Sequence, residues 1–470
     1  MYYLNRRNLS LPVAFVATLS SLPFSCKTVL VQASFSSGST FCCKWYKSRA
    51  IFDRTINERR LVQRVRARMV RTSINGGQQE NRSISNESLT YKENDFDNWR
   101  NSLDYKRNVE TREYFENNVS FDAAKFAVNE VMGRSMEKGQ GSPVFRYARK
   151  HFYNEMDDMF DALFSSKDVC ISNKDTELYN AQAEDKSNRQ RSFAVEVAYR
   201  GDRFCGWQIQ KSNIQPSVQG SLVDILTPVL NNIDNPNKVK NADIRCAGRT
   251  DAGVSAIGQI CRVRTYKSAI GSDAVTSTSI QDEINDKGKL LYSDSFVLRC
   301  TKVQEVDKSF HPTFCASKRA YVYLIDIDTD VTDQRLVLNE SHVNILNTLL
   351  RSIEGKELDY YALSYGKVKT ETTLCTLLRS RASLVEYSGY DGSMMSCAEK
   401  RRSICIELVG NRFLRRMVRI LVATAVRETL FAAQKFSGEE LLQIIEGKDR
   451  TRSAFPAPPV GLIFVKAHFK

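Results

Sequence analysis

Apolar and polar residues follow regular periods mainly in the second half of the chain. Every second residue from Phe193 to Tyr199 is apolar, which is the period of a half-buried strand. From Val218 to Ile233 the apolar residues are spaced as on one face of a helix. Pro228 lies inside this helical pattern, so the sequence predicts a kink or an early stop there. Ordered structure is therefore predicted from Ser192 onward.

The same reading predicts further elements toward the C-terminus. Strands are expected over 297–303, 316–328, 403–409 and 462–469, and helices over 342–353, 412–430 and 437–446. The last helix opens on Ser437-Gly438-Glu439-Glu440, which has the form of a capping box. Strands outnumber helices and several strands are half-polar. This pattern is typical of antiparallel sheets with helices on one side, an α+β fold.

The first 191 residues have a different composition. Residues 77–191 are rich in Asn, Asp, Glu, Lys and Ser, and only 121–132 and 145–164 show some helical periodicity. We interpret this range as a polar extension that is partly helical and partly disordered. Residues 1–76 are basic, and the first 52 contain neither Asp nor Glu. That composition is typical of a disordered targeting segment.

The apolar run from Leu9 to Phe24 leaves several types of leader open. Ser and Pro interrupt it and it is too short to span a membrane, so no membrane partner is expected. Arg6-Arg7 before it would suit a secretory signal, whereas the Ser-rich, acid-free stretch after it suits a plastid leader. We favour an organelle, with plastid first and mitochondrion second. A basic tail on a cytosolic or nuclear protein is the alternative.

The formal net charge of +14 says little about the folded part of the chain. Residues 1–76 hold thirteen basic and two acidic residues, so most of the excess lies in the targeting segment. An argument for nucleic-acid binding must therefore rest on local clusters of Lys and Arg in the folded part of the chain. The twelve cysteines form no C-x-x-C pair and the four histidines lie far apart in sequence. No metal site is expected, and free thiols fit a reducing compartment.

The segment Gly248-Arg249-Thr250-Asp251-Ala252-Gly253 places one carboxylate in a tight turn. Glycine on both sides permits backbone geometry that a side chain forbids. Arg249 can keep the carboxylate ionised or bind a phosphate. An Asp-Ala-Gly by itself usually marks only a turn.

Four arginines share one side of the predicted helix 412–430. Arg412, Arg415, Arg416 and Arg419 form this stripe, with no acidic residue among them. Like charges four residues apart repel each other on a helix. An anionic partner such as RNA would relieve the repulsion, whereas the ordinary interpretation of such a stripe is a solvated face.

Five ordered blocks resemble the TruA family of tRNA pseudouridine synthases, over Phe193 to Lys470. The blocks are 193–210, 246–259, 310–323, 410–419 and 457–462. The resemblance implies a pseudouridine synthase-like fold, in which two α/β halves with mainly antiparallel sheets form a central basic cleft. We place the halves at 192–310 and 311–470. It also implies a tRNA substrate and a possible homodimer.

The resemblance assigns roles to five residues. Asp251 matches the essential nucleophile, and Arg419 is expected to pair with it. Arg249 is expected to bind phosphate or to fill the gap left by a flipped-out base. Tyr321 matches the tyrosine that stacks on uracil, and Leu462 matches an apolar residue of the uracil pocket. Because the reaction oxidises nothing and needs no energy input, no cofactor is expected.

The remaining arginines of the stripe, Arg412, Arg415 and Arg416, are then expected to contact RNA phosphates. Ser255 stands where bacterial members commonly have His, a variant more like members that act on the anticodon arm. Two other interpretations stay open at this point. One is an RNA-binding chaperone that keeps the fold without the reaction, and the other is a glycosidase, which normally needs a second carboxylate.

Overall fold

A computed structural model describes residues 99, 102–133, 191–210, 215–230, 242–265, 275–290, 297–327, 336–368, 370–388, 400–432 and 436–469. These residues belong to one compact unit, Asp97–Lys470. The expected targeting segment 1–76 and the helical stretch predicted over 145–164 lie outside the described residues. The role of both therefore stays a prediction.

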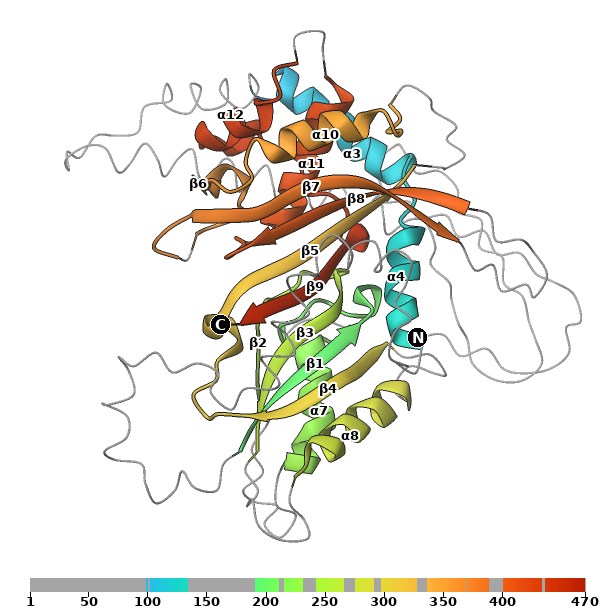
Figure 1. Cartoon of the computed structure of the whole chain (residues 1–470), viewed down its shortest axis with the longest axis vertical. Coiled ribbons are helices and arrows are strands. Elements are labelled where there is room, and N and C mark those ends of the chain that lie inside the picture. The colour runs from blue at the N-terminus through green and yellow to red at the C-terminus, as the bar shows by residue number, and fades with distance from the viewer. Residues whose placement is uncertain are drawn as a thin grey trace, which may run out of the picture. The chain divides into compact units, whose positions relative to one another are not determined.

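Nine strands of the described part form one continuous sheet (Figure 1). Its order is β4-β1-β3-β9-β5-β8-β7-β6, and β2 pairs with β3 beside this path. All pairs are antiparallel except β3 with β9, so the predicted α+β class with mainly antiparallel pairing is confirmed. The strands are β1 (Ser192–Tyr199), β2 (Asp243–Cys246), β3 (Ser255–Arg264), β4 (Leu298–Val306), β5 (Ala316–Asp326), β6 (Glu357–Asp359), β7 (Leu374–Ser388), β8 (Lys400–Gly410) and β9 (Leu462–Phe469).

The last strand joins the two halves of the sheet. β9 pairs with β3 of the first half and with β5 of the second half. Every one of its residues is buried, because neighbouring strands flank it and side chains cover both of its faces. The chain therefore returns through its C-terminal residues to the middle of the molecule.

Helices flank both halves. They are α3 (Leu103–Asn117), α4 (Asp122–Gly133), α7 (Val218–Leu230), α8 (Ser277–Leu290), α9 (Pro312–Cys315), α10 (His342–Arg351), α11 (Met417–Leu430) and α12 (Glu440–Glu446). Figure 1 shows α7 and α8 beside the β1–β4 half, and α3, α10, α11 and α12 beyond β7. α4 lies alongside both halves and contacts β1, β3, β5 and β9.

The helices α3 and α4 come from the range interpreted as a polar extension, yet they pack on the sheet. The buried carboxylate of Asp326 in β5 accepts hydrogen bonds from the backbone N–H groups of Asp122, at 2.7 Å, and Ala123, at 3.4 Å. Asn108 of α3 donates to Ser453 O at 3.0 Å and accepts from Arg427 of α11. These buried polar contacts fix α4 to β5, and α3 to α11 and to the backbone at Ser453.

The predicted helix over 412–430 was wrong at its start. The helix begins at Met417, and Arg416 before it has φ 59°, in the left-handed region. The carbonyl of Arg415 accepts a hydrogen bond from Tyr365 N–H at 3.0 Å, so another loop uses a group that a helix would need. Of the four arginines, only Arg419 lies on the helix, and the single helical stripe does not exist.

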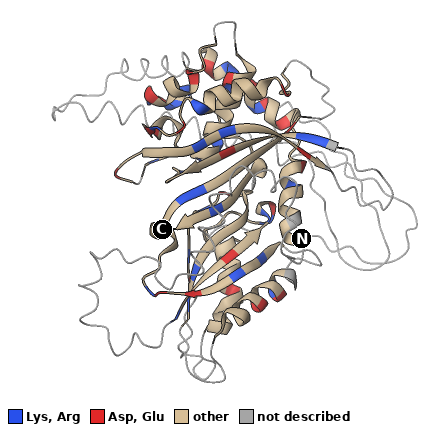
Figure 2. Cartoon of the chain, viewed as in Figure 1, with Lys and Arg blue, Asp and Glu red and all other residues tan. Residues whose placement is uncertain are grey.

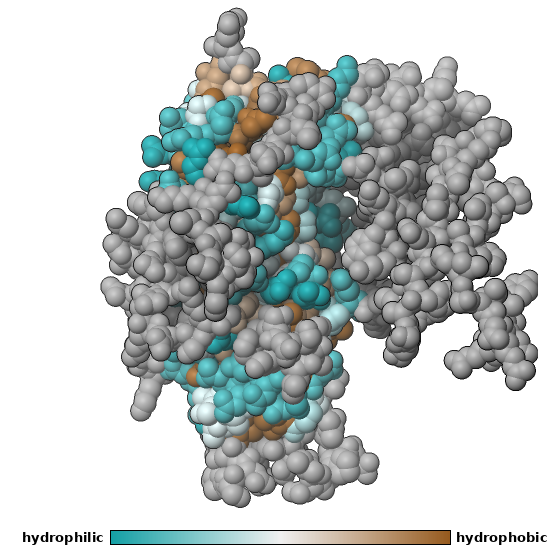
Figure 3. Space-filling view, turned by 90° about the vertical axis from the view of Figure 1, so that its right-hand side faces the viewer, coloured by the Kyte–Doolittle hydropathy of each residue, from teal (hydrophilic) through white to brown (hydrophobic). Residues whose placement is uncertain are grey.

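Two other boundaries differ in smaller ways. α7 continues to Leu230 in spite of Pro228, which lies in its last turn. α12 begins at Glu440, whose side chain accepts a hydrogen bond from the Ser437 N–H at 2.8 Å. Among the residues that the structure describes, no helix is both long and apolar enough to cross a bilayer. On the side of the molecule shown in Figure 3, the described surface is mainly hydrophilic, with smaller apolar areas between.

Candidate active site

Residues 247–254 connect β2 to β3 and carry Asp251; we call this segment the Asp251 loop. The N–H of Val254 donates to the carbonyl of Asp251 at 3.2 Å and closes a turn. Gly253 in this turn has φ 81°, which a side chain rarely tolerates. A Cβ there would also lie 2.8 Å from Pro459, so the turn passes directly beside the loop that precedes β9.

Buried groups behind the Asp251 loop hold its backbone. Tyr199 OH hydrogen-bonds Thr250 Oγ1 at 2.8 Å, and the N–H of Trp207 donates to Thr250 O at 3.1 Å. The fully buried amide of Gln259 donates to Gly248 O and accepts from Gly248 N–H at 3.3 Å. Sequence reasoning missed these supports, although a glutamine inside the apolar run of β3 was a signal that could have found Gln259.

The serine that departs from the bacterial pattern has a partner within the fold. Ser255 Oγ accepts a hydrogen bond from the N–H of Gly201 at 3.0 Å. A Cβ on Gly201 would lie 2.3 Å from the carbonyl carbon of Val254, so only glycine permits this approach. Ser255 therefore joins the end of the Asp251 loop to the turn after β1.

Two arginines approach the carboxylate of Asp251 from the start of α11. Arg419 Nη1 donates to Asp251 Oδ2 at 3.4 Å, so the ion pair that the resemblance implied is present. Arg416 Nε lies 3.8 Å from the same oxygen. The exposed fractions are 29% for Asp251, 12% for Arg419 and 32% for Arg416, so solvent screens the pair only in part.

Hydrogen bonds to the backbone of Ala457 hold Arg419, the less exposed of the two arginines. Arg419 Nε donates to Ala457 O at 2.6 Å, and the N–H of Ala457 donates to Arg419 O at 3.1 Å. Burial lowers the pKa of Arg419, although the neighbouring Asp251 opposes this shift. An arginine remains protonated in spite of such a shift, so Arg419 presents a positioned cation to the carboxylate.

The outer arginine rests on an aromatic ring. The guanidinium carbon of Arg416 lies 4.0 Å from the ring centroid of Tyr365, and that of Arg415 lies 5.5 Å from it. Sequence reasoning missed Tyr365, which belongs to none of the five blocks. It also expected Arg416 to contact RNA phosphate, whereas the structure places it beside Asp251.

Aromatic side chains form the wall next to the Asp251 loop. Tyr321 of β5 meets Phe413 and Phe464 edge to face, at ring-centroid distances of 5.0 and 5.1 Å. Burial raises the pKa of Tyr321 above its ordinary value, so its hydroxyl stays neutral. A Cβ on Gly248 would lie 3.5 Å from Tyr321 OH, which shows how closely the loop passes over this ring. Leu462 is buried at the start of β9.

The other arginines predicted for the site form no ion pair with Asp251 among the described residues. Arg249 and Arg415 are exposed and Arg412 is half-buried. Within the described part of the chain, Arg249 forms no ion pair with Asp251 or any other carboxylate. Arg319 of β5, which sequence reasoning did not single out, donates to Ala247 O at 3.1 Å and to Asn411 O at 2.8 Å. It thereby links the Asp251 loop to the segment before α11.

The surroundings of Asp251 offer carboxylate chemistry. Burial raises the pKa of the nearby Cys246 thiol to about 12, so this cysteine is not a thiolate nucleophile at neutral pH. No group of three or more His, Cys, Asp and Glu residues suited to a metal ion occurs among the described residues. Figure 2 shows Lys and Arg residues on several strands, including β5 and β7.

Comparisons with known proteins agree on one family. A family model described as tRNA pseudouridine synthase matches residues 358–470. A tRNA pseudouridine synthase A of Thermosipho africanus is 31% identical over 281 residues, covering 59% of this chain and 100% of the relative. Relatives of the same name from Pseudothermotoga lettingae and Anaplasma marginale are 30% and 26% identical and are covered over 100% and 99% of their length.

Proposed function

Because the chain belongs to the TruA family of tRNA pseudouridine synthases, we propose that it isomerises uridine to pseudouridine in tRNA through Asp251. One observation carries the assignment of the residue. Asp251 lies in a turn whose backbone is held by buried hydrogen bonds. The guanidinium groups of Arg416 and Arg419 both approach its Oδ2 atom, and the ring of Tyr321 lies beside the same loop. The chemistry below follows from that arrangement.

The reaction exchanges one bond to the ribose for another. The bond from C1′ to N1 of uracil breaks, the base turns, and C1′ bonds to C5, while C5 loses a proton and N1 gains one. No atom is gained or lost overall. A carboxylate can attack the sugar or accept a proton from it, and either step requires its ionised form. Two arginines lie against the carboxylate of Asp251, at 3.4 and 3.8 Å from Oδ2.

The two arginines leave part of the carboxylate open. Both contacts fall on Oδ2, so Oδ1 has no hydrogen-bond partner among the residues described here. We assign Oδ1 to the substrate and Arg419 to holding the carboxylate in place. Tyr321 and Leu462 supply the aromatic and apolar surface that an extruded uracil would meet.

Three further arginines of the matched blocks fit contacts to the RNA backbone. Arg249 and Arg415 are exposed, Arg412 is half-buried, and none of the three pairs with a carboxylate among the described residues. We assign them to phosphates of the tRNA. The Val254-Ser255-Ala256 variant supports a target uridine in the anticodon arm.

Release of tritium from uridine C5 tests the activity and the role of Asp251 together. Wild-type protein incubated with tRNA labelled at C5 should release tritium into water. Asp251→Ala should release it about 10²- to 10⁴-fold more slowly, because the essential carboxylate is gone. Asp202→Asn is the matched control, since Asp202 is an exposed acid that contacts only surface arginines.

Other results would support other functions. Tight tRNA binding without any release would indicate an RNA-binding chaperone. Liberation of free uracil would indicate a glycosidase. Release by Asp251→Ala at the control rate would remove Asp251 from the proposed role.

We further propose organellar action, in plastids first and mitochondria second, and assembly as a homodimer. The support for the first is the acid-free composition of the N-terminal 52 residues, and for the second the family alone. Imaging residues 1–76 fused to a fluorescent protein tests the location. Sedimentation velocity of the purified protein tests the dimer, which a single monomeric species would contradict.

A further inference from the structure

A phenylalanine stands exposed on the turn α9, immediately before β5. Phe314 is 83% exposed, more than any other large hydrophobic side chain of the described residues. Its ring packs on His311 with a centroid distance of 4.4 Å and an angle of 31° between the rings. One face of Phe314 is therefore supported while the rest of the ring is open. A single exposed apolar side chain is ordinary at a protein surface, but a ring that is held in place on one face can offer its open face to a partner.

The turn that carries Phe314 is tied to the Asp251 loop. Thr313 Oγ1 donates to the carbonyl of Cys246 at 2.7 Å. Arg319 donates through Nη2 to Thr313 O at 2.6 Å and through Nε to Ala247 O at 3.1 Å. The backbone N–H groups of Phe314 and Cys315 both donate to His311 O, which closes the turn. Phe314 is thus fixed relative to the loop of the active site.

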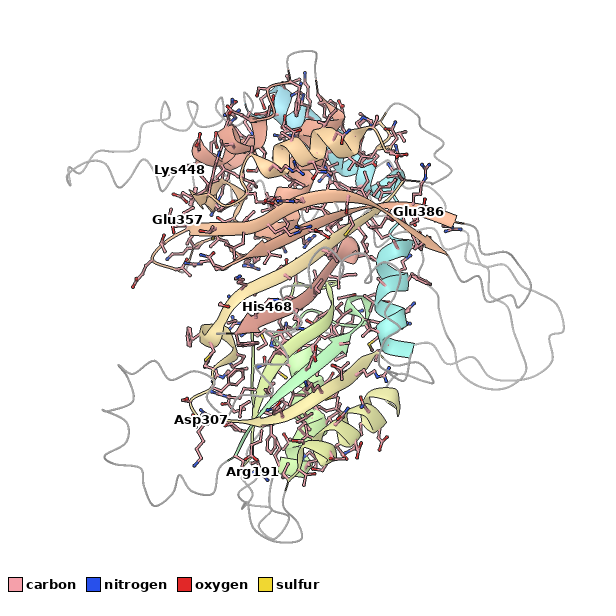
Figure 4. All side chains as sticks on the ribbon, in the orientation of Figure 1. Arg191, Asp307, Glu357, Glu386, Lys448 and His468 are labelled. Carbon is pink, nitrogen blue, oxygen red and sulfur yellow. The ribbon has the colours of Figure 1, made fainter. Side chains whose placement is uncertain are left out.

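The first residue of β5, Ala316, pairs with Phe469 near the end of β9. Because α9 comes immediately before β5, it lies near the tip of the β9 arrow in Figure 1. In Figure 4, Asp307 precedes the turn and His468 lies on β9, and both are at this end of the sheet. Leu462 lies at the other end of the same strand. Phe314 is therefore separated from the uracil wall along β9 and does not belong to it.

The surroundings of the aromatic pair are basic. Burial lowers the pKa of His311, and then the charges of Arg262, Arg245 and Arg264 lower it further, so the ring stacks as a neutral group. Asp243 pairs with Arg245 at 2.9 Å and with Arg262 at 3.0 Å. Because one carboxylate serves two arginines, positive charge remains in excess. An anionic partner would gain from this excess.

We propose that Phe314 is a stacking platform for a nucleobase of the tRNA, outside the pocket of the reacting uridine. The proposal rests on the proposed function for its tRNA substrate. Every base has a face that stacks on an aromatic ring. The phosphates of the stacked nucleotide would lie against the exposed Arg245 and the half-buried Arg264. A fixed, supported ring loses little conformational freedom when a base stacks on it, unlike a free side chain. The platform would position tRNA before the target uridine leaves its helix.

Replacing the ring tests the proposal through binding alone. We expect Phe314→Ala to weaken binding of fluorescently labelled tRNA about 5- to 150-fold, which is what one stacked base contributes. Phe314→Trp should bind within a few-fold of wild type, because it keeps an aromatic face. Leu378→Ala is the matched control, since Leu378 is an exposed apolar residue on β7 that is not part of this cluster. Because no charge is removed, the salt dependence should keep its slope.

Steady-state kinetics give a second readout. Phe314→Ala should raise KM for tRNA and leave kcat within about 2-fold, because the ring does not touch the reacting atoms. Unchanged binding by Phe314→Ala, or an equal loss in Phe314→Trp, would overturn the platform. A change of oligomeric state in Phe314→Ala with unchanged binding would overturn it too, in favour of a subunit contact.

Failure of this proposal can be told apart from failure of the proposed function. Equilibrium binding requires no turnover. If wild type released no tritium while Phe314→Ala still lost tRNA affinity, the platform would stand and the isomerisation would not. If wild type released tritium and Phe314→Ala bound tRNA normally, the proposed isomerisation would be supported and the stacking platform would be contradicted.

Discussion

At the scale of single residues, Asp251 depends on two arginines that differ in depth. Arg419 is nearly buried and is fixed by Ala457, whereas Arg416 is more exposed and lies farther from the carboxylate. A charge-assisted hydrogen bond in a shielded position contributes more than an ion pair open to solvent. The two side chains should therefore differ in their effect on the reaction.

We predict that Arg419→Ala slows tritium release about 10- to 150-fold, the equivalent of one charge-assisted hydrogen bond of about 1.5 to 3 kcal/mol. Arg416→Ala should slow it less than Arg419→Ala. Rates measured with saturating tRNA separate the effect on Asp251 from weaker RNA binding. Equal rates for the two variants would contradict the difference in depth.

Gln259 gives a second prediction for a single residue. Gln259→Leu should lower the free energy of unfolding by about 1 to 3 kcal/mol, because both backbone groups of Gly248 lose their partner. Activity should fall as well, since the Asp251 loop would no longer be held. Denaturant unfolding and tritium release measure the two effects, and full activity of a folded Gln259→Leu protein would argue against support by this amide.

The sequence located most of these residues by motif but not by contact. Asp251, Arg419 and Tyr321 belong to recognisable blocks. Gln259 lies at the end of a block and Tyr365 lies outside all of them, and the roles of both come from segments that meet only in the folded chain. Arg416 belongs to a block, but its position beside Asp251 depends on a backbone conformation that residue types do not reveal.

At the scale of elements, the start of α11 shows why periodicity failed there. The spacing of apolar residues is helical from residue 412, but the segment before Met417 turns through the left-handed conformation of Arg416. Such a conformation costs a non-glycine residue about 1 to 2 kcal/mol, and the fold accepts this cost beside Asp251. The turn directs Arg416 onto Tyr365 and toward the carboxylate.

This strain can be measured with two variants. Arg416→Gly should unfold with a free energy about 1 kcal/mol higher than Arg416→Ala, because glycine adopts a positive φ without the penalty. Both variants lack the cation and should release tritium at the same reduced rate. Chemical denaturation provides the comparison, and equal stability of Gly and Ala at this position would show that no strain is stored.

The strand β9 carries a pH-dependent group. His468 is 2% exposed, and burial, followed by the charges of Lys466 and Lys318, lowers its pKa to about 4. The pKa of a histidine in the unfolded chain is about 6.5. At pH values between the unfolded and the folded pKa, His468 is therefore protonated in the unfolded chain and neutral in the folded chain. Stability contributed by neutral His468 is therefore present above that window and is lost as the pH falls through it.

Wild type should lose up to about 3 kcal/mol between pH 7 and pH 4 through this residue, at about 1.4 kcal/mol for each pKa unit. His468→Phe should lack this component of the loss. His342→Gln, a change at a half-buried histidine of α10, is the control and should follow wild type more closely. Unfolding free energies at a series of pH values test the slope, and parallel curves for wild type and His468→Phe would refute it.

At the scale of the whole molecule, α3 and α4 belong to the body that carries the site. The buried Arg427 of α11 donates one of its hydrogen bonds to Asn108 of α3, and Asp326 of β5 accepts hydrogen bonds from the first N–H groups of α4. Phe121 at the start of α4 meets the ring of Tyr323 at right angles, with a centroid distance of 6.1 Å. Without these helices the second half of the sheet would expose apolar and polar groups together.

A truncation tests this dependence. A chain that begins at residue 97 should melt near the full-length protein, whereas one that begins at residue 192 should melt at a lower temperature or aggregate. The point change Asn108→Ala should cost about 1 to 3 kcal/mol by leaving Arg427 short of a partner. Equal melting temperatures of the two shortened chains would show that α3 and α4 contribute no stability.

The sequence by itself indicated the fold class and many of the strands and helices. The alternation of β1, β5 and β9 indicates an α+β fold, because side-chain periods are local properties. The role of Asp251 followed from the resemblance of its block to the TruA family. Only the tertiary structure decided which groups meet. It put β9 between the two halves, brought Arg416 and Tyr365 to Asp251, and supported Phe314 on His311. Such meetings depend on strand order and backbone turns between distant segments, and no local pattern encodes them.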